Sequence, residues 1–567
     1  MDNQKKIKNT IFITSLFFIL FYSVSIKTAN AVDINFNIDK NFDAGARSKI
    51  PATLVKTTPN LYFYIEESWW NSQVLARQNE ILTYLDVLSS EFDSKIYPTL
   101  TSVFGSEWKP GVDGDSKITI LFHSMKDGAA GYFRSADEYI KLQEPSSNEK
   151  EMLYIALSHI DNPQLKVFLA HEFVHLITFN QKDRIQGVQE EIWFNEARAD
   201  YASTILGYDK SFEGSNLQRR VKDFLQNPQD SLTEWQETKY DYAVVSLFMH
   251  YLADHYSISV LTDSLKLKSI GIKSINETLL KIGIKEDFGQ IFVNWTIATT
   301  INNCLDDLKY CYLNQNLKNL RINPILNFLP VTGNSSLSVT NITKNWSGNW
   351  QKIIGGNGDL KLEFSSLTGL SFQVPYIVFD KNNNYSVNFL QLGENQKGEI
   401  SIKDFGNKYN SLIIIPSLQT KISGFNGLEF TYPYSFKVSV TGATVEENQV
   451  LIQRLLDQIE SLKKQIVAIQ SGNNSLNNAL CSKLNNNLYF GIINKSEVMC
   501  LQSFLKSQGV EIYPEALVTG NFAALTKSAV IRFQEKYKNE ILTPLGLSKG
   551  TGFVGDLTRV KINRLLK

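Results

Sequence analysis

The sequence predicts a multidomain protein in which an α+β region leads into a helical region, a β-sandwich, a coiled coil and a small helical module. Three observations support this fold class. The chain has 567 residues, which is too many for a single hydrophobic core. Its apolar residues change along the chain from mixed to helical and then to strand-like spacing. A polar stretch at 471–479 is typical of a linker before a separate C-terminal part.

These changes of pattern set the expected domain boundaries. They are a signal peptide at 1–31, an N-terminal α+β part at 33–165, a helical part at 166–320, a β-sandwich at 325–441, a coiled coil at 445–470, a linker at 471–479 and a small helical module at 480–567.

The N-terminal segment is typical of a secretory signal peptide. A Lys-rich start precedes an apolar run at 11–26, and Ala29-Asn30-Ala31 offers a cleavage site of small residues. The alternative is an uncleaved membrane anchor, because the run is long for a signal and short for a spanning helix. Either alternative predicts an exported protein that is secreted or held at the cell surface.

The charge and the cysteine content limit which binding partners and which disulfide bonds are expected. Lys+Arg and Asp+Glu both number 57, so the formal net charge is zero and no nucleic-acid partner is expected. The cysteines form two local pairs, Cys304 with Cys311 and Cys481 with Cys500. More than one pairing is possible, and local pairing is the simplest. A bond between Cys304 and Cys311 requires a turn, because on one helix they would lie roughly 10 Å apart.

The predicted α+β region combines strand-like runs with one long helical run. The strands are "NLYFYIEES" and "SKITILFHS", and the helix is "NEILTYLDVLSSEFDSKIYPTLTSVFG", whose apolar residues recur at three and four. The run "NEKEMLYIAL" at 148–157 is a candidate edge strand, which would pair with an extended peptide through free backbone groups. The alternative is an ordinary strand of the sheet.

Helical periodicity dominates at 166–320 and disappears at 325–441. It is carried by "QLKVFLAHEFVHLITFN", "EEIWFNEARADYASTIL", "YAVVSLFMHYLADHY" and "EDFGQIFVNWTIATTIN". Short β-rich runs between Asn, Gly and Ser turns then predict an accessory sandwich. Beyond it, apolar residues at spacings of three and four predict a parallel coiled-coil homodimer, or alternatively a lone helix packed on its own chain. These residues are Ile452, Leu455, Ile459, Leu462, Ile466 and Ile469.

The stretch "AHEFVHLITFN" at 170–180 predicts a metal site. Four residues of α-helix turn by about 400°, so His171 and His175 would lie on one face and reach a single ion. The alternative is an ordinary buried helix with polar interruptions. A catalytic Zn²⁺ also needs a third protein ligand and an open position.

Three acids downstream compete to be the third ligand: Glu190, Glu191 and Glu196. On one helix Glu196 and Asp200 share a face, whereas Glu190 and Glu191 diverge from Glu196 by roughly 120–140°. Only Glu196 has an acid one turn later that could orient a ligating histidine. Glu196 is therefore the predicted ligand, with Asp200 behind the site.

The segment from Asn195 to Asp200 resembles the second zinc helix of thermolysin-like gluzincins. In that pattern the glutamate binds zinc, and the aspartate one turn later holds the first histidine. "EFDSKIYPTLTSVFG", "GYFRSADEY", "SNEKEMLYI" and "DYAVVSLFMHYLADHYS" further resemble the hyicolysin family of secreted bacterial metallopeptidases. This resemblance spans about 60–300 and implies a zinc endopeptidase acting on protein or peptide substrates.

The resemblance also implies roles in catalysis. Glu172 would be the general base that takes a proton from the attacking water and passes it to the leaving amine. Tyr242 is the first candidate to stabilise the oxyanion, a position where gluzincins often supply a tyrosine. The competing candidates are Tyr240, His250 and His255.

The C-terminal part, 480–567, resembles the peptidoglycan-binding-like module of bacterial wall proteins. The matching residues are Leu501, Gln502, Leu505, Gly520, Phe522, Thr526, Ala529, Val530, Phe533 and Gln534. The resemblance implies attachment to peptidoglycan, and the alternative is a compact packing module. Two rival functions follow for the whole chain. One is a hydrolase of peptide cross-links in the cell wall, and the other is a non-catalytic surface adhesin that keeps a structural zinc helix.

Overall fold

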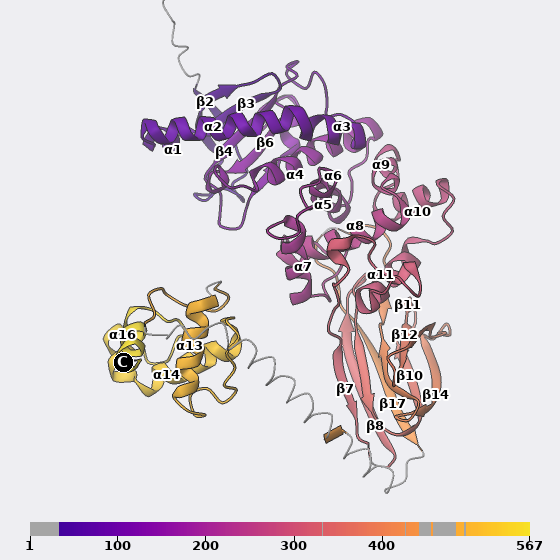
Figure 1. Ribbon diagram of the computed structural model, residues 1–567. Coiled ribbons are helices and arrows are strands. Elements are labelled where there is room, and N and C mark those ends of the chain that lie inside the picture. The colour runs from indigo at the N-terminus through magenta and orange to yellow at the C-terminus, as the bar shows by residue number, and fades with distance from the viewer. Residues whose placement is uncertain are drawn as a thin grey trace, which may run out of the picture. The chain divides into compact units, whose positions relative to one another are not determined.

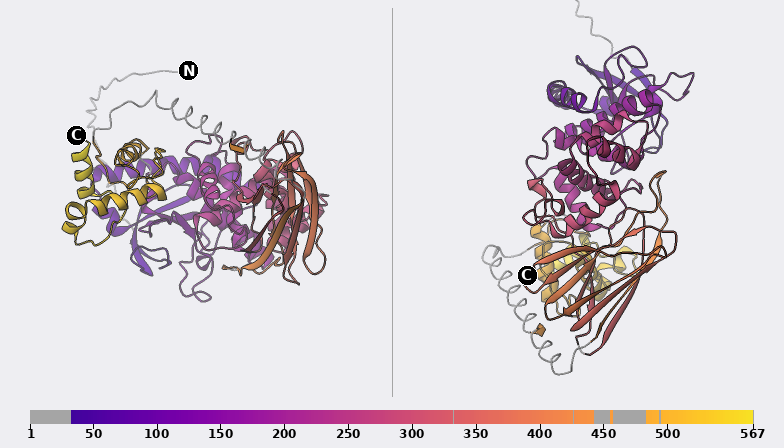
Figure 2. Two further views of the ribbon diagram at one scale, coloured as in Figure 1. Left: turned by 90° about the horizontal axis from the view of Figure 1, so that it is seen from below. Right: turned by 90° about the vertical axis from the view of Figure 1, so that its right-hand side faces the viewer.

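The computed structural model (Figure 1 and Figure 2) describes residues 33–331, 333–425, 427–441, 455–456, 483–492 and 495–566. It is a mixed α/β, multidomain chain that divides into two compact units, 1–451 and 452–567. No helix in the described part is long and apolar enough to cross a membrane. Four features predicted from the sequence lie outside the described residues. They are the signal peptide at 1–31, the linker at 471–479, Cys481, and the coiled coil at 445–470 apart from residues 455–456.

The first unit opens with a six-stranded sheet in the order β1-β2-β3-β4-β6-β5. Its strands are β1 (Asp33–Asn37), β2 (Lys49–Thr57), β3 (Leu61–Glu66), β4 (Ile118–His123), β5 (Gly131–Phe133) and β6 (Met152–Ala156). β3, β4 and β6 run parallel, and β5 pairs antiparallel with β6 at one edge. The two strand-like runs of the sequence correspond to β3 and β4.

Of the two alternatives for 148–157, the edge strand is wrong and the ordinary strand of the sheet is confirmed. β6, which lies within that run, is hydrogen-bonded to β4 on one side and to β5 on the other. The edge is β5, a strand of three residues. A run this short carries no recognisable alternation, so the sequence showed β6 but not the neighbour that covers it.

One long helical stretch packs on this sheet, as predicted. It consists of α1 (Glu67–Ser72), α2 (Leu75–Glu91), a π-helical turn (Phe92–Ile96) and α3 (Tyr97–Phe104). Figure 1 shows α2 lying across the strands. Its buried side chains recur at three and four and enter the core beside the sheet. They are Ile81, Leu85, Leu88, Phe92, Ile96, Leu100 and Phe104.

The helical part follows and shares this core. It contains α4 (Leu165–Thr178), α5 (Ile192–Asp200), α6 (Ala202–Ile205), α7 (Asn216–Gln226), α8 (Lys239–Tyr256), α9 (Ser259–Asp263), α10 (Gly271–Lys281) and α11 (Phe288–Ile301). Thr238 and Asp241 close a capping box at the start of α8, which fixes where that helix begins. After α11 the chain turns at Asn302, and the predicted disulfide between Cys304 and Cys311 is confirmed, with a Cα–Cα distance of 5.2 Å.

The β-rich region expected at 325–441 forms two groups of strands. They comprise β7 (Ile325–Leu329), β8 (Ser335–Thr343), β9 (Gln351–Gly355), β10 (Gly358–Ser366), β11 (Phe372–Gln373), β12 (Pro375–Asp380), β13 (Tyr385–Phe389), β14 (Lys397–Phe405), β15 (Tyr409–Ile414), β16 (Ser417–Leu418) and β17 (Tyr432–Thr441). β8, β17, β10 and β14 form one group, β13, β12, β15, β9 and β7 form the other, and β11 and β16 pair with each other as a separate two-stranded sheet. A single pair, Phe405 with Tyr409, joins the two groups. Side chains of both groups share one core.

The second unit is a small helical module built on a repeated hydrogen-bond pattern. It contains α13 (Lys495–Ser507), α14 (Ala524–Lys536), α15 (Lys538–Ile541) and α16 (Asp556–Leu565). The side-chain oxygen of Gln502 accepts hydrogen bonds from the backbone N–H groups of Thr519 and Gly520. Gln534 repeats this pattern with the residues Thr551 and Gly552. Each buried glutamine therefore ties a helix to the turn that precedes the next helix.

Candidate metal centre

Helices α4 and α5 bring together the three side chains that the sequence singled out as metal ligands. Nε2 of His171 lies 3.2 Å from Nε2 of His175 and 3.1 Å from Oε2 of Glu196. Nε2 of His175 lies 3.5 Å from Oε1 of Glu196. Among the described residues, these three form the one group of His, Cys, Asp or Glu whose ligand atoms all lie within 4.8 Å of one another.

The donor set fits a zinc ion. Two nitrogen ligands at the usual bond length from a tetrahedral ion lie roughly 3.3 Å apart, close to the 3.2 Å between the two Nε2 atoms. Two imidazoles and one carboxylate leave the fourth position for water or substrate. Structural zinc sites, in contrast, use all four positions for protein ligands. The three side chains could therefore hold a metal ion of the catalytic type.

Electrostatics also favour a cation between these side chains. Burial disfavours the charged imidazole of His175, but the carboxylate of Glu196 outweighs burial and raises the pKa of His175 to about 9. Burial likewise opposes ionisation of Glu196, yet the two imidazoles hold its pKa well below the usual range. The Glu196 carboxylate is thus ionised and faces inward, where positive charge stabilises it.

Glu172, the predicted base, lies between this centre and the edge of the sheet. Its side chain is 6% exposed. Burial, and to a lesser degree the charge of Glu196, raises its pKa above the usual range, while the two histidines oppose this shift. The edge strand β5 runs alongside, because a Cβ placed on Gly131 would come within 3.0 Å of Oε1 of Glu172.

Asn195 is a residue of the centre to which the sequence assigned no role. Its side chain acts on His175 and raises the pKa of that imidazole. Nδ1 of His175 and Oδ1 of Asn195 are both buried, and neither makes a hydrogen bond within the described part of the chain. An amide oxygen beside Nδ1 fixes the tautomer in which Nε2 is free to bind a metal. The sequence could have indicated Asn195 as a residue of the centre, since it directly precedes the candidate ligand Glu196.

Asp200 lies behind the centre and is held by α7. Its Oδ1 accepts hydrogen bonds from Nε and Nη2 of Arg220 at 2.9 and 2.6 Å, and from Nδ2 of Asn216 at 3.1 Å. Burial would raise the pKa of Asp200, but Arg220 and, more weakly, His171 lower it to about 2. Within the described residues no hydrogen bond joins Asp200 to His171. Oδ2 of Asp200 is buried without a partner.

Of the four candidate oxyanion donors, Tyr242 is the one in contact with the metal centre. Its ring centroid lies 6.3 Å from that of His171. Arg220 lies 4.7 Å from the ring centroid of Tyr242, and Trp235 packs edge-on at 4.8 Å. Helix α8 begins at Lys239, so Tyr242 lies near its capped N-terminal end, which positions the side chain.

The three competing donors, His250, His255 and Tyr240, contact other residues. Nε2 of His250 lies 3.3 Å from Oγ1 of Thr204, and Nε2 of His255 lies 2.9 Å from the backbone oxygen of Cys311. Lys239 lies over the ring of Tyr240 at 5.0 Å.

The carboxylates of Glu190 and Glu191 accept hydrogen bonds from other parts of the protein. Oε2 of Glu190 accepts a hydrogen bond from Arg198 at 3.1 Å, and its Oε1 accepts one from the backbone of Gly271 at 2.7 Å. Glu191 accepts hydrogen bonds from Nε1 of Trp193 and from the backbone N–H of Gly424. Both carboxylates are therefore already occupied, and Glu191 links α5 to the β-rich region.

No protein-family model and no curated protein matches this chain. Solved structures give only weak likenesses, with TM-scores of 0.15 or below in the following cases. A periplasmic inhibitor of g-type lysozyme from Aeromonas hydrophila is 11% identical, with a TM-score of 0.15, over 21% of this chain and 98% of its own. The pre-peptidase C-terminal domain of a Bacillus anthracis collagenase is 8% identical, with a TM-score of 0.15, over 20% of this chain and 96% of its own. At such scores neither likeness bears on the fold or the function.

Proposed function

We propose that this chain is an exported zinc-dependent endopeptidase. The observation that carries the proposal is the convergence of the ligand atoms of His171, His175 and Glu196 within 4.8 Å, with Glu172 beside them and a coordination position left open. A structural zinc site has no need of an open position or of an adjacent base. This argument disfavours the alternative of a non-catalytic adhesin.

The residues of the centre divide the chemistry between them. His171, His175 and Glu196 would hold the ion, which when bound supplies Lewis acidity toward a peptide carbonyl. Glu172 accepts a proton from the attacking water and delivers it to the leaving amine. Tyr242 donates a hydrogen bond from its hydroxyl to the oxygen that becomes negative during attack. Asn195 orients His175 by holding its tautomer.

The sheet edge supports an extended polypeptide as the substrate. β5 pairs with β6 through one side, so the backbone groups of its other side can pair with a peptide strand. Gly131 of β5 lies against Glu172. A peptide added to this edge would therefore run past the base, with its scissile bond next to the metal ligands.

A digest of casein by the purified full-length protein tests this proposal. We expect cleavage that a chelator abolishes and that added zinc restores. Purified wall sacculi, digested in parallel, test the rival wall hydrolase: release of cross-link peptides without cleavage of casein would favour that rival. Absence of any chelator-sensitive cleavage in both digests would overturn the proposed function.

A further inference from the structure

Five acidic side chains gather away from the zinc ligands, around the loop that joins β5 to β6 and the segment after α3. Three of them have a cationic partner. Oδ1 of Asp137 lies 2.8 Å from Arg134, Oδ2 of Asp113 lies 2.9 Å from Lys150, and Oε1 of Glu107 lies 3.4 Å from Lys109. The other two are Glu138 and Glu151, which are 2% and 3% exposed. No ion pair of either is found among the described residues.

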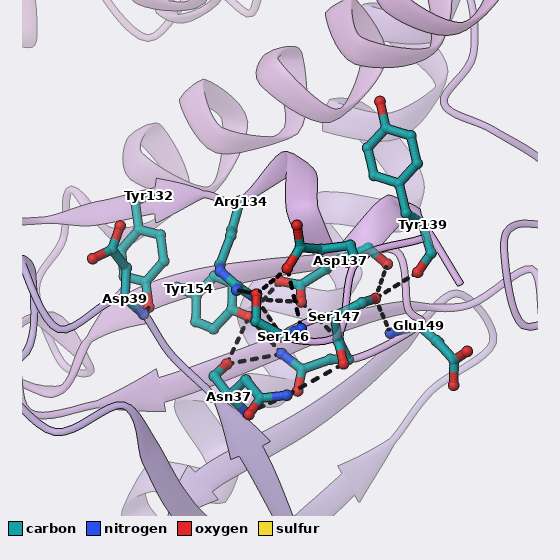
Figure 3. Close-up of polar contacts among 12 residues, drawn as sticks. Asn37, Asp39, Tyr132, Arg134, Asp137, Tyr139, Ser146, Ser147, Glu149 and Tyr154 are labelled. Carbon is teal, nitrogen blue, oxygen red and sulfur yellow. Dashed lines mark hydrogen bonds and ion pairs between the residues drawn. The ribbon is translucent and has the colours of Figure 1, made fainter. Parts of the chain in front are cut away.

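Glu138 has no hydrogen-bond partner on either carboxylate oxygen. The residues before and after it, Asp137 and Tyr139, are held by hydrogen bonds of the network in Figure 3. The preceding residue, Asp137, accepts hydrogen bonds from the hydroxyl of Tyr154 at 2.5 Å and from the backbone N–H of Asn148 at 2.8 Å. The hydroxyl of Ser147 donates to the backbone oxygen of Tyr139 on the other side, at 2.6 Å. The chain therefore fixes Glu138 in a buried position where its charge is unsatisfied.

Two further carboxylate oxygens near Glu138 are buried without a partner. They are Oε2 of Glu151 and Oε2 of Glu107. Oε1 of Glu151 accepts a hydrogen bond from the backbone N–H of Val112 at 2.7 Å. Its Oε2 lies against Gly111, where a Cβ would come within 1.8 Å of it, and Gly111 has a φ of +97°. A glycine is thus required for the chain to close around this carboxylate.

These carboxylates act on one another. Burial raises the pKa of Glu138 well above the usual range, and the charges of Glu151, Asp137, Asp113 and Glu107 raise it further. A buried carboxylate that lacks both a cation and hydrogen bonds is strongly unfavourable. Four unpartnered oxygens on two segments, the β5–β6 loop and the segment after α3, therefore call for a ligand with positive charge.

We infer that Glu107, Glu138 and Glu151 bind one hard divalent cation, Ca²⁺, at a site separate from the zinc centre. The side chains of Arg134, Lys150 and Lys109 compensate three of the five carboxylates. The charges of the remaining two would be neutralised by one divalent ion. Only oxygen atoms are offered, which suits Ca²⁺ rather than a metal that prefers nitrogen or sulfur. Ca²⁺ also accepts irregular arrangements of six to eight oxygens, whereas Mg²⁺ demands a near-ideal octahedron.

Binding has to draw the three side chains together. In the described part of the chain, only the zinc ligands have donor atoms all within 4.8 Å of one another. Glu107 follows α3, whereas Glu138 and Glu151 lie in the loop between β5 and β6, so the ion would tie these two segments together. Because the ion binds the folded chain and not the unfolded one, it raises stability.

Calorimetric titration of Ca²⁺ into the zinc-loaded, calcium-free full-length protein tests the site. We expect one bound Ca²⁺ and a rise in Tm of roughly 2–4 °C at a hundredfold excess over Kd. Glu138→Gln and Glu151→Gln should lose both the binding and the rise in Tm while keeping zinc. Glu144→Gln is the matched control, because Glu144 lies in the same loop but accepts its hydrogen bonds from Ser146.

The alternative is that Glu138 simply carries a proton. In that case wild-type protein would bind no Ca²⁺, and Glu138→Gln, which mimics the protonated acid, would leave Tm unchanged with or without the ion. Either result would overturn the inference. Zinc content and Ca²⁺ binding are measured without substrate, so this outcome does not depend on whether the protein is a peptidase.

Discussion

Gly131 lies against Glu172, so closely that a Cβ on the glycine would come within 3.0 Å of Oε1 of the glutamate and 2.7 Å of the backbone oxygen of Tyr154. The edge strand and the proposed base thus share one tight contact. A Cβ between the backbone oxygen and the base forces one of them to move.

Gly131→Ala is therefore expected to lower kcat/KM by roughly ten- to a hundredfold, because a displacement of about 1 Å at the reacting groups has this effect. Zinc content should stay at the wild-type level, since the metal ligands lie on α4 and α5. Steady-state kinetics on a fluorogenic peptide, beside metal analysis, measures both. Wild-type kinetics in the alanine variant would show that β5 does not constrain the base.

Glu172→Gln should keep the metal and lose hydrolysis. The amide has nearly the same shape as the carboxylate but cannot accept a proton from water, so we expect a loss of roughly 10²–10⁴-fold in kcat. Metal analysis and peptide kinetics on the same preparation decide the matter. Substantial turnover by the metal-replete variant would assign the base to another residue.

Glu196→Ala should lose zinc, because the remaining two imidazoles offer too few ligands for a stable site. Glu190→Gln and Glu191→Gln are the matched controls and should retain it. Their carboxylates bind Arg198 and Trp193, and the amide keeps the size of the side chain. Metal analysis of the three purified proteins measures the zinc content per chain. Retention of zinc by Glu196→Ala, together with its loss from a control, would contradict the assignment.

Tyr242→Phe should reduce kcat by roughly ten- to a thousandfold and leave zinc content unchanged, if the hydroxyl faces the developing oxyanion. The ring would keep its contacts with Trp235 and Arg220, so little change in Tm is expected. Tyr240→Phe serves as the control on the neighbouring turn. Equal kcat values in all three proteins would move the role to a different donor.

The three side chains of the candidate metal centre could be predicted from the sequence because helix geometry is local. A spacing of four brings His171 and His175 onto one face, and Asp200 one turn after Glu196 singled out that acid. The order of strands could not be predicted, because it depends on pairing between distant segments. The run at 148–157 indicated β6, but no sequence pattern indicated β5, which covers it. Periodicity also gave no sign of the buried acid Glu138, since its burial results from the loop network around Asp137.

Asp230 should make the folded state less stable as the pH rises. Burial raises its pKa to about 7, and the neighbouring carboxylates of Asp241 and Glu234 contribute, while Lys344 opposes them. In the unfolded chain an aspartate has a pKa of about 3.9. The folded state therefore binds this proton more tightly. Its contribution to stability is lost as the pH rises from about 4 to about 7.

Asp230→Asn keeps the neutral form at every pH, so it should raise Tm at pH 8 and change it little at pH 4.5. Asp127→Asn, at an exposed position, controls for the loss of one negative charge. Thermal unfolding of wild-type and both variants at the two pH values measures the difference. Because Asp241 accepts the hydrogen bonds that cap α8, relief of its repulsion with Asp230 should also steady the helix that carries Tyr242. An equal change in Tm at pH 4.5 and pH 8 would show that Asp230 does not hold a proton in the folded protein.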